Sequence, residues 1–164
     1  ATYTETLARD MGRLCRQADV IVPNLTEAAI LLEASYREQP SFPQVEAMLR
    51  ALHKRYGCRQ AVITGILRDG LLGAAAYDAQ HDCVFFHGQP PMEHVFYGTG
   101  DVLASALLAG LMRGRSLSQA TTLAVDFTYQ SMLHTLDNGL PLRYGVAFEQ
   151  ALPMLVRSLE SNAC

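Results

Sequence analysis

The sequence of 164 residues has no run of basic residues, and its formal net charge is −3. A nucleic-acid-binding protein needs a cationic surface along the phosphate backbone, so the charge pattern argues against that class. The four cysteines lie far apart and lack the C-x-x-C spacing of zinc and thioredoxin-like sites. We interpret them as ordinary thiols of a reducing compartment.

Several other familiar features are also lacking. No apolar run is long enough to span a bilayer and no signal peptide opens the chain, so we expect a soluble cytoplasmic protein without membrane contact. The Walker motif G-x-x-x-x-G-K-[ST] does not occur, which argues against a P-loop protein. No G-x-G-x-x-G joins a first strand to a helix, which argues against a dinucleotide-binding dehydrogenase.

The composition and the hydrophobic pattern indicate a globular α/β protein. Apolar residues make up 49% of the chain and charged residues 18%, enough for a core in one domain of residues 1–164. Helices are predicted at 4–17, 26–33, 45–57, 102–112, 116–136 and 146–159. Strands are predicted at 18–22, 61–64, 71–77 and 83–87, the last two as a hairpin. The alternation favours helices layered on a largely parallel sheet.

Gly98-Thr99-Gly100-Asp101 is the most informative motif, because it stands directly before the helix predicted at 102–112. Glycines at such a junction allow backbone N–H groups to point at an anion, and the helix dipole favours negative charge there. A carboxylate beside this anion site suits a general base that takes a proton from an attacking hydroxyl. The alternative is a simple helix start, with glycine for the turn and Asp101 as a cap.

Pro23-Asn24-Leu25-Thr26-Glu27 follows the strand predicted at 18–22, and ligands of α/β sheets bind beyond the carboxyl ends of strands. The carboxylate of Glu27 suits Mg²⁺, which prefers oxygen ligands and keeps several waters. The alternative is a capping box between Asn24 and Glu27.

Thr64 and Gly65 close the second strand, where a hydroxyl and a flexible backbone can meet a phosphate. The alternative at this position is a turn that ends the strand.

Three segments together resemble the pyridoxal kinases and the related hydroxymethylpyrimidine kinases of the ribokinase superfamily. They are VIVPNLTEA at 20–28, AVITG at 61–65 and FYGTGDVLASALLAGLMRG at 96–114. The resemblance continues through the later helices and so covers essentially the whole chain. It implies a ribokinase-like three-layer α/β/α sandwich, of which this chain is the C-terminal half.

The resemblance also implies an activity, namely ATP-dependent phosphorylation of the 5′-hydroxymethyl group of pyridoxal, pyridoxamine or pyridoxine. Asp101 would be the catalytic base, and the backbone of Gly98, Thr99 and Gly100 the anion hole for the γ-phosphoryl group. Glu27 would organise Mg²⁺ through water. The positions near the nucleotide would be Asn24, Thr64, Gly65, His94, Val95, Phe96 and Tyr97.

Members of this family are much longer than this chain, and the first predicted strand aligns with the middle of their sequences. Without its neighbours, the strand at 18–22 or at 61–64 would leave an apolar edge exposed, so we expect association with the missing N-terminal half or with a second copy. A hydroxymethylpyrimidine kinase and a nucleotide-binding module without catalysis remain the alternative functions.

Overall fold

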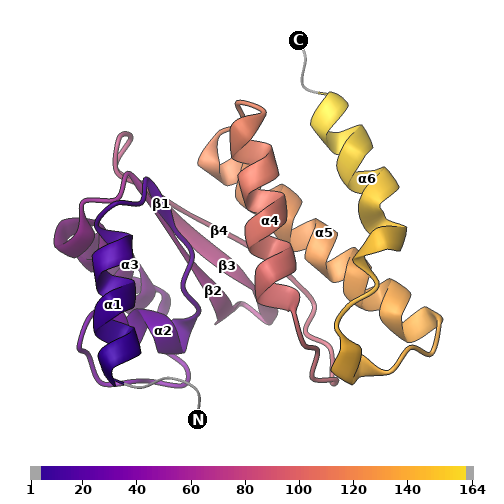
Figure 1. Ribbon diagram of the computed structural model, residues 1–164, viewed down its shortest axis with the longest axis horizontal. Coiled ribbons are helices and arrows are strands. Elements are labelled where there is room, and N and C mark those ends of the chain that lie inside the picture. Colours follow the sequence, from indigo (N-terminus) through magenta and orange to yellow (C-terminus); the bar gives the residue numbers. More distant parts are fainter. Residues whose placement is uncertain (1–4, 162–164) are drawn as a thin grey trace. The chain divides into compact units, whose positions relative to one another are not determined.

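The computed structural model describes residues 5–161, which form two compact units (Figure 1). The first comprises residues 5–68 and 73–86, and the second comprises residues 69–72 and 87–161. Residue 4, where the first helix was predicted to begin, lies outside the described residues. Within them, no helix has the length and the apolar character needed to cross a bilayer.

The first unit combines helices with most of a sheet. Its helices are α1 (Glu5–Cys15), α2 (Leu25–Leu31) and α3 (Phe42–Tyr56). The strands are β1 (Val20–Ile21), β2 (Gln60–Arg68), β3 (Leu71–Asp78) and β4 (Cys83–Gln89), and the hairpin tip and the last residues of β4 belong to the second unit.

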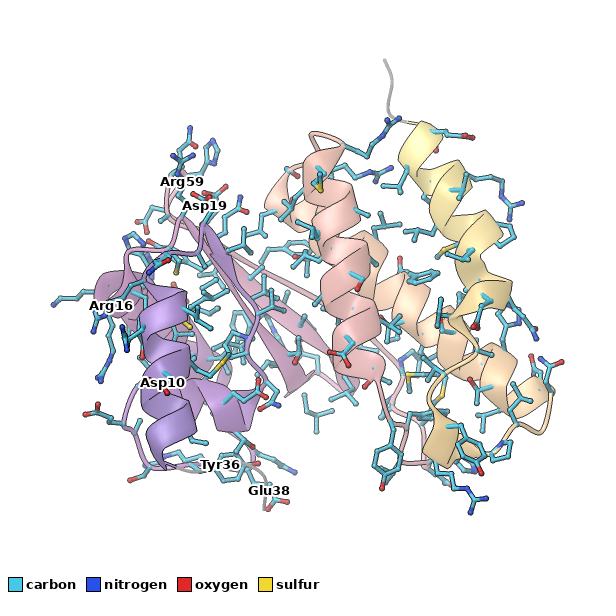
Figure 2. The ribbon with its side chains drawn as sticks, in the orientation of Figure 1. Asp10, Arg16, Asp19, Tyr36, Glu38 and Arg59 are labelled. Atoms are coloured by element: carbon cyan, nitrogen blue, oxygen red, sulfur yellow. The ribbon has the colours of Figure 1, made fainter. Side chains whose placement is uncertain are left out.

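The sheet has the strand order β1-β2-β3-β4. β1 is parallel to β2, with Val20 opposite Gln60, and Asp19 and Arg59 form an exposed ion pair at the start of both strands (Figure 2). Asp69 and Gly70 join β2 to β3 with positive φ angles of 52° and 78°, as a two-residue hairpin turn requires. The predicted hairpin of β3 and β4 is confirmed, whereas the pairing of β2 with β3 was not predicted.

The core of the first unit lies where the helices meet the sheet. α3 packs on β2, and Leu49 and Leu52 of α3 are fully buried together with Ile63 of β2. Apolar residues of α3 recur three and four positions apart, so one side of the helix is buried against the strand. The two elements that carry Asn24 and Thr64 are thus held on one apolar core.

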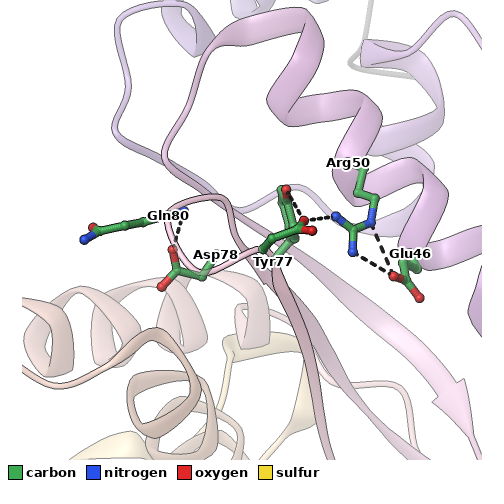
Figure 3. A network of polar contacts seen from close by, with 6 residues as sticks. Glu46, Arg50, Tyr77, Asp78 and Gln80 are labelled. Carbon is green, nitrogen blue, oxygen red and sulfur yellow. Dashed lines mark hydrogen bonds and ion pairs between the residues drawn. The ribbon is translucent and has the colours of Figure 1, made fainter.

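A polar network ties the turn between β3 and β4 to α3 (Figure 3). The Arg50 guanidinium donates to Glu46 and to Asp82, and the Tyr77 hydroxyl donates to Asp82 at 3.0 Å. The guanidinium also lies 4.8 Å from the centre of the Tyr77 ring. The hydrogen bonds from Arg50 and Tyr77 hold the pKa of Asp82 below its usual value. The network therefore links the turn between β3 and β4 to α3.

The second unit is built around its longest helix. Its helical elements are α4 (Thr99–Met112), α5 (Leu117–Asp137), the short 3₁₀ helix η1 (Leu142–Tyr144) and α6 (Phe148–Glu160). α5 packs against both α4 and α6 (Figure 1). The end of β4 is tied to α5, because His87 Nε2 and Gln89 Nε2 each lie 2.6 Å from Asp126 Oδ1.

A glycine allows α4 and α5 to approach closely. A Cβ placed on Gly110 would lie 3.0 Å from Ala120 Cβ and 3.1 Å from Ala120 Cα. These distances are shorter than ordinary van der Waals contacts, so only a residue without a side chain fits here without displacement. The neighbouring Arg115 guanidinium donates to the Ser158 carbonyl near the end of α6, which is a favourable place for a cation.

Candidate functional site

The N-terminus of α4 has no side-chain cap. Gly98 is its N-cap with φ 76°, and the first intrahelical bond runs from the Val102 N–H to the Gly98 carbonyl at 3.1 Å. The first turn is therefore Thr99, Gly100 and Asp101, three residues earlier than the predicted start at Val102. The sequence analysis placed the start of this helix too late. Glycine is unfavourable in the interior of a helix but is tolerated in its first turn.

The N–H groups of this first turn have no acceptor among the described residues. α2 and α5, by contrast, begin with an N-cap side chain that accepts from the third residue of the helix. The capping interpretation of Asp101 is wrong, because Asp101 is the third helical residue and forms no cap. The donors at the start of α4 are thus available to an anion, as the helix dipole favours.

Asp101 is exposed at the side of this first turn. Its backbone carbonyl accepts a hydrogen bond from Ser105 Oγ at 2.7 Å, and the carboxylate takes no part in that bond. Gly100 leaves open space before the turn, since a Cβ placed on it would meet no atom within 4 Å. A carboxylate therefore lies next to free N–H donors and open space, the arrangement that a general base for an incoming hydroxyl needs.

The residues before α4 expose apolar surface beside its start. Val95 is 73% exposed and Tyr97 is 61% exposed, while the rings of His94 and Phe96 meet edge to face at 6.3 Å. All four belong to the same unit as Gly98 and precede it directly. The structure thus keeps the segment predicted to lie near the nucleotide beside the first turn of α4.

A second glycine segment meets this turn, and sequence reasoning missed its role. Gly145 has φ 101°, and a Cβ placed on it would lie 3.9 Å from the Tyr97 carbonyl oxygen. A Cβ on Gly98 would in turn lie 4.0 Å from Gly145 Cα. The backbone before α6 therefore lies against the backbone before α4. The sequence signal was only an isolated glycine, Gly145, in a loop far from Gly98. A single glycine does not indicate which segment it will contact.

Asn24 and Glu27 form the capping box that the alternative interpretation predicted. Asn24 Oδ1 accepts from the Glu27 N–H, and Glu27 Oε2 accepts from the Asn24 N–H, both at 2.9 Å. These bonds fix the start of α2 directly beyond β1. A carboxylate offers about four acceptor positions, so the cap leaves most of Glu27 available to water or a cation.

Thr64 lies beside Asn24. The two residues form a parallel bridge, with the Thr64 N–H donating to the Pro23 carbonyl at 3.0 Å. The predicted strand end at Thr64 is wrong, because β2 continues to Arg68. The backbone conformation changes at Gly65, which has a positive φ of 77°. This residue is exposed, with open space around it. Pairing to β1 stops here and the strand continues with β3 as its neighbour.

The side chains beyond the end of β1 offer few ligands for a magnesium ion. The described residues contain no cluster of three or more acidic, histidine or cysteine side chains that could hold a metal. Glu27 is the carboxylate at the end of β1, and Mg²⁺ commonly binds through one or two carboxylates with waters and substrate phosphates completing its shell. The donors therefore fit a magnesium ion that arrives with a nucleotide, not one held by the protein alone.

The predicted site residues thus form two groups. Asn24, Glu27, Thr64 and Gly65 lie together in the first unit, and residues 94–101 lie together in the second. A family model described as phosphomethylpyrimidine kinase matches residues 2–143. The chain belongs to this kinase family.

Solved structures agree with this assignment. A pyridoxal kinase from Lactobacillus plantarum is 31% identical, with a TM-score of 0.85 over 98% of this chain and 57% of its own. A candidate phosphomethylpyrimidine kinase from Bacteroides thetaiotaomicron is 29% identical, with a TM-score of 0.88 over 93% of this chain and 53% of its own. A second crystal form of the Bacteroides protein contains pyridoxal. Among curated proteins none matches this chain.

These relatives confirm the predicted ribokinase-like α/β fold. They also show that the chain spans little more than half the length of the structures it matches.

Proposed function

We propose that the protein phosphorylates the 5′-hydroxymethyl group of pyridoxal, pyridoxamine or pyridoxine with ATP. The observation that carries this proposal is the uncapped first turn of α4 with the Asp101 carboxylate beside it. Membership of the kinase family and the likeness to a pyridoxal kinase and to a protein crystallised with pyridoxal support it.

Asp101 acts as the general base in this proposal. Its carboxylate takes the proton of the substrate hydroxyl while the hydroxyl oxygen forms a bond to the γ-phosphorus of ATP. The bond between that phosphorus and the bridging oxygen breaks, and ADP leaves with the electron pair. Backbone N–H groups at Gly98, Thr99 and Gly100 stabilise the charge on the transferring group, which is where most of the catalysis of phosphoryl transfer resides.

The remaining site residues hold the nucleotide. Glu27, with Asn24 nearby, would hold a magnesium ion through water, and the charge of that ion would offset the charge of the ATP phosphates. Thr64 and Gly65 offer a hydroxyl and an open backbone to a phosphate. The exposed rings and aliphatic groups of residues 94–97 suit a planar base, because aromatic faces stack well on one another.

A hydroxymethylpyrimidine kinase is the second candidate, because the matching family model carries the description phosphomethylpyrimidine kinase. Both substrates present a hydroxymethyl group on an aromatic ring, so the same base and anion hole would serve either. The choice depends on side chains that contact the ring.

The proposal is tested by measuring ADP release from MgATP by the complete protein. Pyridoxal, pyridoxamine, pyridoxine and hydroxymethylpyrimidine are offered separately, and a reaction without acceptor gives the background. We expect release that depends on a B6 vitamer. Release with the pyrimidine alone would favour the second candidate, and nucleotide binding without release would indicate a non-catalytic module.

We also propose that the β1 edge of the sheet pairs with further polypeptide, either the part of the relatives that this chain does not cover or a second copy. β1 is the edge strand, and beside it an apolar pocket of about 240 Å³ opens. Glu27 is the charged residue of its lining, and the rest of the lining is uncharged. Leu14, on the pocket wall, is 62% exposed. An unpaired edge with apolar surface favours association.

Light scattering on the chain of residues 1–164 checks this proposal. We expect a mass of at least a dimer for the chain alone. Adding a separate chain that corresponds to the part of the relatives that this chain does not cover should give a one-to-one complex. A monodisperse monomer that ignores the added half would contradict the proposal.

A further inference from the structure

Four buried hydroxyl side chains lie along α5, namely Thr121, Thr128, Ser131 and Thr135. Each donates to the carbonyl of the residue four positions earlier, at 2.7–2.8 Å. This back-bonding satisfies a hydroxyl locally and needs no partner outside the helix. It explains why α5 tolerates these side chains in its interior.

Thr135 differs from the others by a second bond. Its Oγ1 also accepts the N–H of Ala147 at 2.8 Å, twelve residues further along the chain. Ala147 is the N-cap residue of α6, and with Val146 it is buried. The hydroxyl therefore fixes the segment before α6 to α5 through one buried hydrogen bond.

That segment leads directly to the start of α4. Gly145 stands two residues before Ala147, and its backbone lies against the Tyr97 carbonyl and Gly98. The φ of 101° favours glycine at this position, while an added Cβ would make only an ordinary van der Waals contact with the Tyr97 carbonyl oxygen. A continuous path of packed backbone thus runs from the Thr135 hydroxyl to the N-cap of α4.

We propose that Thr135 is a positioning residue for the anion-binding turn of α4. It acts through Ala147 and Gly145, which hold Gly98 and the N–H donors of the first turn in place. This inference rests on the proposed kinase function. The physical reason is that N–H donors stabilise a transferring phosphoryl group only when they already point at it. A shift of about 1 Å in their position lowers the rate of the reaction.

The test compares Thr135→Val with Thr128→Val in the complete protein. Both variants remove a buried hydroxyl that back-bonds within α5, but only the first leaves the Ala147 N–H without its acceptor. We expect Thr135→Val to lower kcat roughly 10- to 100-fold, with the KM for the vitamer changed less than about 2-fold. Thr128→Val should stay within about 2-fold in both constants, and Thr135→Ser should restore most of the loss.

Hydrogen exchange gives a readout that does not depend on activity. Thr135→Val should speed amide exchange at residues 145–148 and also at 97–102, whereas Thr128→Val should change neither segment. Equal kcat values and equal exchange rates in the two valine variants would overturn the positioning role of Thr135. The proposed kinase function would still stand in that case, provided that the wild type is active. A wild type without turnover toward any acceptor would overturn the proposed function and with it the catalytic part of this inference.

Discussion

Asp101→Asn is expected to lower kcat for phosphoryl transfer by roughly 10²- to 10⁴-fold, the usual contribution of a general base. The amide keeps the shape of the side chain but cannot take the proton of the substrate hydroxyl. Nucleotide affinity should change little, because the N–H donors of the first turn belong to the backbone. The measurement is steady-state ADP release together with the Kd for ADP.

The free energy of unfolding should fall by no more than about 1 kcal/mol in this variant, since Asp101 is exposed and is not the N-cap of α4, and only its charge near the helix dipole is lost. Glu149→Gln is the matched control, because Glu149 is an exposed carboxylate in the first turn of α6. Its kcat should equal that of the wild type. Normal turnover in Asp101→Asn would show that another group takes the proton. Loss of ADP binding in the same variant would indicate a role in holding the nucleotide.

Gly110→Val is expected to destabilise the second unit by about 1–3 kcal/mol through overpacking. Even the first added carbon would lie 3.0 Å from Ala120 Cβ, and the two methyl groups beyond it would have to displace α5. Valine has a higher helix propensity than glycine, so the local preference opposes this effect by a few tenths of a kcal/mol. The change in Tm should be roughly 2–4 °C for each kcal/mol in a domain of this size.

Leu108→Val is the control for this prediction. It places the same β-branched residue in the same helix at a position that is 56% exposed, so only propensity changes. We expect its Tm to stay within about 2 °C of the wild type. A Tm of Gly110→Val equal to that of the control would mean that α4 and α5 separate more easily than their contact suggests.

Local chemistry explains why many elements were predictable. Asn24 and Glu27 carry their capping box in adjacent sequence, and the hairpin of β3 and β4 follows from two neighbouring strand patterns. The order of helices and strands was correct for the same reason, because periodicity reports which face is buried. The first turn of α4 was predicted as an anion site from glycine and aspartate alone, although the helix was expected to start later.

Pairing and packing partners were less predictable. The strand expected at 18–22 is reduced to Val20 and Ile21, since β2 is its only neighbour in the described sheet. β2 was expected to end at Thr64 but continues to Arg68, where β3 supplies a second partner. The 3₁₀ turn Leu142–Tyr144 was not predicted either, because its sequence has no helical period.

The sequence by itself determined the α/β class and the family, since these depend on residue type and short spacing, and it supplied the residues that we propose for phosphoryl transfer. The tertiary structure alone decided which distant segments meet. Gly110 against Ala120, Thr135 on Ala147, and Gly145 beside Tyr97 are contacts between residues at least ten positions apart. Such contacts arise from how whole helices pack, and no local preference of a glycine or a threonine specifies its partner.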